Sequence, residues 1–82
     1  MNLISPSHEF DMQFAELFEG RQVGIKPITG PHFSMEVEEI DPDNFVTLVG
    51  REVFFHDEFD PTKTYGEVRR IALIDIDRIE AY

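Results

Sequence analysis

The pattern of apolar and polar positions predicts one helix at the start of the chain. Apolar residues recur at the spacing of a single helix face, at Phe10, Phe14, Leu17 and Phe18. Pro6 suits the first turn of a helix, and Gly20 suits the position just after its end. We therefore expect an amphipathic helix over residues 6–19.

Beyond Gly20 the period changes to the alternation of half-buried strands. Turn-forming residues, Thr29-Gly30-Pro31 and Asp41-Pro42-Asp43-Asn44, separate the alternating segments. The alternation slips at Glu39-Ile40, which predicts a bulge or a sharp bend there. We expect strands over residues 22–28, 33–40 and 45–49, and a last stretch over 68–82 that is interrupted at Asp75.

The stretch between Gly50 and Gly66 has a weaker pattern. Residues 53–55 fit an extension of the preceding strand, and residues 56–66 fit an exposed acidic loop. A helix followed by short, bent strands with tight turns predicts a mainly β fold. We expect a single domain over residues 1–82, in which residues 21–82 form a strongly bent, five-stranded small barrel.

The last strands carry apolar residues at both odd and even positions, and therefore on both of their faces. A domain of 82 residues has too small a core to bury both faces of such a strand. One face is therefore expected to meet another copy of the chain. The candidate interface residues are Ile71, Ala72, Leu73, Ile74, Ile76 and Ile79.

Composition excludes several function classes. Seven Lys and Arg against 17 Asp and Glu give a formal net charge of −10, which argues against a general polyanion binder and against an anionic membrane surface. A hydrophobic content of 41% is too high for a disordered acidic chain. No apolar run approaches a membrane span and no signal peptide is present, so we expect a cytoplasmic protein.

Motifs of catalysis and of cofactor binding are missing from the sequence. It has no cysteine, no glycine-rich phosphate loop, no nucleophile elbow and no zinc-ligand spacing. Four residues of the acidic loop could bind a cation, but their spacing fits no defined metal loop: His56, Asp57, Glu58 and Asp60. We therefore expect that the protein is not an enzyme and that it binds neither a cofactor nor a metal ion.

Three of the seven basic residues cluster near the C-terminus, at Arg69, Arg70 and Arg78. In an oligomer they would repeat and form a local basic band with access to phosphate groups. Alternatively, they are solvated residues at strand ends, or they pair with the carboxylates of Asp75, Asp77 and Glu80 within or between subunits.

Four segments of the sequence form a recognisable pattern. They are Leu17-Phe18-Glu19-Gly20-Arg21-Gln22-Val23, Phe33-x-Met35-x-Val37-x-x-Ile40-Asp41, Asn44-Phe45-Val46-x-Leu48 and Ile74-Asp75-Ile76-Asp77-Arg78-Ile79. Through these segments the sequence, from about Phe10 to Tyr82, resembles the Sm-like family of Sm, LSm and Hfq proteins.

The sequence departs from the family pattern at several positions, and the family's two RNA-contacting signatures, arginine-glycine in Sm proteins and lysine-histidine in Hfq, are missing. Asp41 and Asn44 are one residue closer than usual, and Met35 stands where glycine is common. Ala72-Leu73 stands where Sm proteins carry arginine-glycine, and Leu73-Ile74 where Hfq carries lysine-histidine. The pattern is that of a diverged member from a bacterium or a phage.

The resemblance implies a homo-oligomeric ring of five to seven subunits, in which the fourth strand of one subunit pairs with the fifth strand of its neighbour. It also implies single-stranded RNA as a partner, with the loop at Asp41 and Asn44 facing the pore and contacting uracil-like edges. Phe45 either stacks on a base or belongs to the core. The candidate RNA-binding residues are Asp41, Asn44, Phe45, Arg69, Arg70, Asp75 and Arg78.

The net charge supports a second hypothesis. An acidic scaffold of the same fold that has lost RNA binding would bind a basic protein instead, because a large negative field attracts such a partner. Alternatively, the charge serves only to keep the protein soluble and to prevent rings from stacking.

Overall fold

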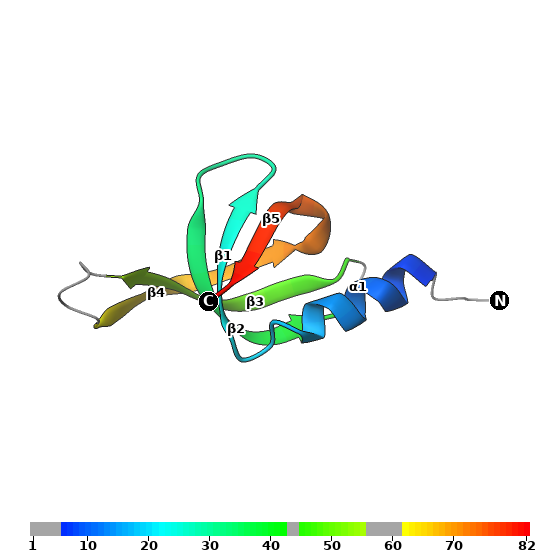
Figure 1. Ribbon diagram of the computed structural model, residues 1–82, viewed down its shortest axis with the longest axis horizontal. Coiled ribbons are helices and arrows are strands. Elements are labelled where there is room, and N and C mark those ends of the chain that lie inside the picture. Colours follow the sequence, from blue (N-terminus) through cyan, green and yellow to red (C-terminus); the bar gives the residue numbers. More distant parts are fainter. Residues whose placement is uncertain (1–5, 43–44, 56–61) are drawn as a thin grey trace.

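The computed structural model describes residues 6–42, 45–55 and 62–82, and it is mainly β (Figure 1). One α-helix precedes five strands, and a 3-10 turn separates the last two of them. In chain order the elements are α1 (Pro6–Glu16), β1 (Gln22–Pro27), β2 (Phe33–Asp41), β3 (Thr47–Phe55), β4 (Lys63–Ala72), η1 (Leu73–Asp75) and β5 (Ile76–Ala81).

Helix α1 begins at Pro6, as expected, but it ends at Glu16 rather than at residue 19. A turn follows and closes at Gly20, whose φ of +77° is the left-handed conformation that glycine adopts at helix ends. Figure 1 shows α1 lying beside β2. The helix is therefore about one turn shorter than the apolar spacing predicts.

The predicted apolar stripe of the helix is only partly buried. Ala15 and Phe18 lie in the core, and Phe14 packs against it, with its ring edge-on to Phe18 at 5.1 Å between centroids. Phe10 and Leu17 are largely exposed. Leu17 follows the last helical residue, so the helical spacing no longer determines the direction of its side chain. Phe10 lies nearer the N-terminal end of the helix.

All five strands form one antiparallel sheet in the order β4-β3-β2-β1-β5. This confirms the expected helix and bent five-stranded sheet. Within the described residues, however, β4 and β5 do not pair with each other, so the sheet is not closed into a barrel. The sheet therefore has two open edges, one on β4 and one on β5.

A bulge bends the sheet between β2 and β3. The register shifts between Val37 and Glu39, just before the Glu39-Ile40 position at which the sequence pattern slips. Gly50 on β3 pairs with Val37 at this point, and a Cβ on Gly50 would lie 1.9 Å from the carbonyl oxygen of Glu36. Only glycine permits the two backbones to approach so closely.

The core lies on one face of the sheet, beneath the N-terminal helix. Alternating residues of β1, β2 and β3 fill it, as expected for half-buried strands. The fully buried large side chains are Val23, Ile25, Met35, Val37 and Leu48.

The expected loop over residues 56–66 is wrong at its C-terminal end. Lys63 to Gly66 belong to β4, where Lys63 pairs with Phe55 and Tyr65 pairs with Val53. The expected extension of β3 through residues 53–55 is confirmed. The four candidate cation ligands, His56, Asp57, Glu58 and Asp60, lie outside the described residues.

Within the described part of the chain, no helix has both the length and the apolar character needed to cross a bilayer.

Candidate nucleic-acid interface

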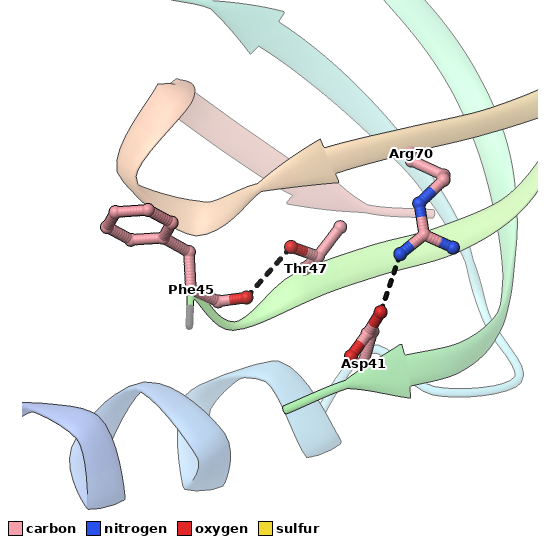
Figure 2. Close-up of polar contacts among 4 residues, drawn as sticks. All are labelled: Asp41, Phe45, Thr47 and Arg70. Atoms are coloured by element: carbon pink, nitrogen blue, oxygen red, sulfur yellow. Dashed lines mark hydrogen bonds and ion pairs between the residues drawn. The ribbon is translucent and has the colours of Figure 1, made fainter. Parts of the chain in front are cut away.

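The turn between β2 and β3 positions two of the predicted RNA-binding residues. Asp41 is the last residue of β2, and Phe45 lies two residues before the start of β3. Asn44, the third candidate in this turn, lies outside the described residues. Figure 2 shows Asp41 and Phe45 on either side of Thr47.

Asp41 forms an ion pair with Arg70 of β4. One oxygen of the Asp41 carboxylate accepts a hydrogen bond from the Arg70 guanidinium at 2.5 Å (Figure 2). The two strands flank β3 on opposite sides, with Asp41 opposite Thr47 and Arg70 opposite Val49. The strand order therefore brings together two residues that are 29 positions apart.

Phe45 is exposed, which excludes the core role that the sequence left open. Its side chain is 59% exposed. The Thr47 hydroxyl donates a hydrogen bond of 2.9 Å to the Phe45 carbonyl and so holds the backbone at the start of β3 (Figure 2). An exposed ring on a fixed backbone can stack on a base.

A hollow of about 520 Å³ lies between β4 and the turn that joins β1 to β2. Three of the predicted RNA-binding residues line it, Arg69, Arg70 and Asp75, together with the apolar side chain of Val68. Its volume is within the range of sites that hold a molecule of nucleotide size. Arg70 thus belongs both to this hollow and to the ion pair with Asp41.

The other arginines are held separately. Arg69 lies over the Phe33 ring at 4.1 Å and beside the Glu52 carboxylate at 3.8 Å. Arg78 lies on β5, directly opposite Lys26 of β1, and does not line the hollow. The structure therefore does not gather the three predicted arginines into one cluster within the chain.

Asp75 contributes its backbone to the fold. Its carbonyl oxygen accepts a hydrogen bond of 2.9 Å from the amide of Ile28, which ties η1 to the turn after β1. Asp75 also lines the hollow, together with Arg69 and Arg70.

The predicted interface residues are divided between the core and the surface. Four of them pack partly against the core of the same chain: Ile71, Leu73, Ile76 and Ile79. Ile74 is largely exposed, and Ala72 is half-buried. Apolar residues at both odd and even positions of the last strands are thus partly buried within one chain.

Sequence reasoning missed two exposed apolar residues on the β4 edge. Val68 is 61% exposed, and Tyr65 is also exposed while its hydroxyl donates to the Glu36 carboxylate at 2.9 Å. For Tyr65 the local pattern contained no strand signal, because residues 63–66 have the composition of a loop. Val68 falls in an expected strand, but its exposure depends on β4 being an edge of the sheet, which the local pattern does not show.

Most of the basic residues form ion pairs. Described carboxylates pair with four of the seven, namely Arg51, Lys63, Arg69 and Arg70. Arg69 and Arg70 do pair with carboxylates, but their partners are Glu52 and Asp41 rather than the expected Asp75, Asp77 and Glu80. No group of three or more His, Asp or Glu side chains that could hold a metal occurs in residues 6–42, 45–55 and 62–82.

Comparison of the chain with protein-family models, curated proteins and solved structures gives no match.

Proposed function

We propose that this chain is an Sm-like protein that assembles into a homo-oligomeric ring and binds single-stranded RNA beside the β2–β3 turn. The strand order β4-β3-β2-β1-β5 carries the proposal, because it leaves β4 and β5 as the two edges of one bent sheet. Open edges invite pairing with another chain, and a closed ring satisfies all of them. The family resemblance of the sequence supplies the β4-to-β5 pairing between subunits.

Exposed apolar side chains at the open edges support the assembly. Val68 lies on β4, and Ile74 lies in η1 directly before β5. Pairing of β4 with the neighbour's β5 removes these side chains from water, which stabilises the ring by about 25 cal/mol for each Å² of apolar surface buried. Ring size follows the family, at five to seven subunits.

Phe45 and Arg70 support RNA as the ligand. The exposed Phe45 ring provides a stacking surface, and the hollow beside Arg70 accommodates a nucleotide. Asp41 holds the Arg70 guanidinium in place and provides an acceptor for the N–H of a uracil-like edge. A ring repeats this set once in each subunit around its pore.

The assembly is tested by placing a charge on the proposed interface. V68D introduces a carboxylate on the β4 edge, and we expect it to reduce the oligomer to monomers in sedimentation velocity. L17D is the matched control, because Leu17 is 63% exposed against 61% for Val68 and lies outside the strands. An unchanged mass for V68D, or an equal loss with L17D, contradicts the proposed edge pairing.

RNA binding is tested by fluorescence anisotropy with labelled oligo-U and oligo-A. We expect F45A to weaken binding by about 5- to 150-fold, because a base stacked on an aromatic ring contributes about 1–3 kcal/mol. F54A is the matched control, since Phe54 is 50% exposed and lies toward the other end of β3. No binding of wild-type protein even at low salt contradicts RNA as the ligand and leaves the ring proposal standing.

An acidic scaffold that binds a basic protein is the second candidate. The observation that favours it is the pairing of four basic residues with carboxylates, which reduces the charge available to phosphate groups. The same anisotropy experiment with a labelled oligo-lysine peptide separates the two. Salt-sensitive binding of the peptide without binding of RNA favours the scaffold.

A further inference from the structure

A second pocket, separate from the β2–β3 turn, lies where β1, β2 and β5 adjoin. It has a volume of about 240 Å³ and is lined by Lys26, His32, Ser34, Arg78, Glu80 and Tyr82 around Gly24. None of these residues touches the Asp41–Arg70 pair or Phe45 in a described contact. The pocket is therefore distinct from the Asp41–Arg70 pair and from Phe45, although Phe33 lines both this pocket and the hollow beside Arg70.

Two cations face each other across the strand pair at this pocket. Lys26 of β1 is directly opposite Arg78 of β5 in the antiparallel register. Residues opposite each other in such a pair have their Cβ atoms about 5 Å apart, and like charges at that separation repel. The repulsion disappears when an anion lies between them.

Neither cation is neutralised by a described carboxylate. Arg51, Lys63, Arg69 and Arg70 each have such an ion pair, whereas among the described residues Lys26 and Arg78 have none. The Lys26 ammonium donates a hydrogen bond of 2.8 Å to the carbonyl of Pro27, which leaves its other two donors for a ligand. In a chain of net charge −10, an opposed pair of unneutralised cations favours an anion.

Gly24 and Tyr82 shape the pocket beside these cations. A Cβ on Gly24 would lie 2.7 Å from the Tyr82 hydroxyl, so the absence of a side chain at residue 24 lets the tyrosine ring lie over β1. The Tyr82 and Ser34 hydroxyls are hydrogen-bonded to each other at 3.2 Å. The pocket lining therefore includes an aromatic ring and two hydroxyl groups.

Glu80 restricts the ligand at one end. It lies opposite Gly24 on β5, two residues along the strand from Arg78 and on the same face. A carboxylate there accepts hydrogen bonds from hydroxyl groups and repels a second anionic group. The pocket therefore combines a cationic end with an end that favours a neutral, hydroxylated body.

We infer that this pocket binds a ribose monophosphate, with the phosphate between Lys26 and Arg78 and the sugar hydroxyls toward Glu80 and the Ser34–Tyr82 pair. Arg and Lys are the usual partners of phosphate oxygens, and His32 adds a third donor on the β2 side. A volume of about 240 Å³ is below the range of about 300–1,000 Å³ for drug-sized ligands, which suits a sugar phosphate. The group belongs either to a free small molecule or to the phosphorylated end of an RNA.

The experiment is an NMR titration of the full chain at constant ionic strength, with ribose 5-phosphate, inorganic phosphate, ribose and chloride as separate probes. We expect saturable amide shifts at Lys26, Ser34, Arg78 and Tyr82 with ribose 5-phosphate, and at least tenfold weaker binding of inorganic phosphate. Shifts with ribose 5-phosphate no larger than those with chloride overturn the site. Equal affinity for inorganic phosphate overturns the assignment of the sugar.

Matched variants locate the binding. K26Q and R78Q are each expected to weaken ribose 5-phosphate about tenfold or more, because each removes a charge-assisted contact to phosphate. R51Q is the control, since it removes the same charge on β3, where Arg51 pairs with Glu38. G24A fills the floor beneath the Tyr82 ring and is expected to reduce binding while amide dispersion stays native. Equal losses with R51Q, or full binding in K26Q and R78Q, contradict the assignment.

The source of the phosphate is distinguished by adding oligo-U with and without a 5′-phosphate to the same sample. Competition with ribose 5-phosphate by the phosphorylated oligonucleotide alone assigns the site to an RNA end. Competition by neither assigns it to a small molecule, and competition by both forms contradicts a monophosphate site. F45A does not alter this pocket, so loss of RNA binding at Phe45 and loss of ribose 5-phosphate binding are separate results.

Discussion

Gly50 is the position at which a single added methyl group tests the bend of the sheet. The Cβ of alanine would lie 1.9 Å from the Glu36 carbonyl oxygen and 2.8 Å from the carbonyl carbon, where Cβ contacts below 3.0 Å are essentially never observed. To reach 3.0 Å, the oxygen contact alone must lengthen by 1.1 Å (3.0 − 1.9). Both obstructing atoms belong to the backbone of β2, so no side chain can rotate to relieve the contact.

The energetic cost follows from that displacement. Separating β2 from β3 by about 1 Å takes N–H···O distances beyond the hydrogen-bonding range of about 3.2 Å. Each lost ladder hydrogen bond costs about 1 kcal/mol, and overpacking costs a further 1–3 kcal/mol or so. We expect Gly50→Ala to lower the free energy of unfolding by about 3 kcal/mol, from a total of roughly 4–12 kcal/mol for a chain of this size.

The assay is urea denaturation followed by circular dichroism at one fixed protein concentration, because assembly makes stability depend on concentration. Gly66→Ala is the control: its Cβ would meet the ring of Phe54 at 2.7 Å, and that exposed side chain can move away. We expect the control to lose less than about 1 kcal/mol. Surface substitutions ordinarily change the free energy of unfolding by no more than about ±0.5 kcal/mol. A change of that size or smaller for Gly50→Ala would refute the close approach of β2 and β3.

Three further outcomes follow from the same structure. Leu48→Ala removes a fully buried side chain and is expected to lower the free energy of unfolding in urea by about 2–5 kcal/mol. Leu17→Ala, at an exposed residue, is expected to lower it by less than about 0.5 kcal/mol, and equal losses for the two variants would contradict the described core. Asp41→Asn breaks the partly exposed ion pair with Arg70 and is expected to cost less than about 1 kcal/mol, and a larger loss would show that the pair is structural. For oligo-U, the slope of log K against log salt is expected to be about −0.7 for each phosphate contacted, so a slope near zero would exclude phosphate contacts.

The order and type of the elements follow from local patterns, whereas the strand edges do not. Alternation places Val23, Ile25, Met35 and Val37 on one face, and all four are buried. Residues 63–66 lack this alternation, since three of them are exposed, and they form a strand because β3 lies beside them. When neither face of an edge strand is covered, its sequence need not alternate between apolar and polar residues, so the pattern does not predict the strand.

The helix shows a second limit of periodicity. The spacing of Phe10, Phe14 and Phe18 identifies one helix face, but how much of that face is covered depends on the length of the sheet beneath it. Phe18, in the turn just after the helix, is buried in the core, whereas Phe10, near the N-terminal end of the helix, is exposed.

The candidate sites depend on pairing register, which local sequence does not contain. Asp41 and Arg70 are 29 positions apart and meet because β3 lies between their strands. Lys26 and Arg78 are opposite each other because β5 returns to pair with β1. The family resemblance indicated Asp41 and Phe45, while the opposed cations at Lys26 and Arg78 became evident only from the sheet.

Native mass spectrometry of the full chain at micromolar concentration tests the ring most directly. The two open edges of the β4-β3-β2-β1-β5 sheet lead us to expect one closed species of five to seven subunits, with little monomer. A spectrum dominated by the monomer would contradict assembly through these edges. An open-ended series of masses would contradict ring closure.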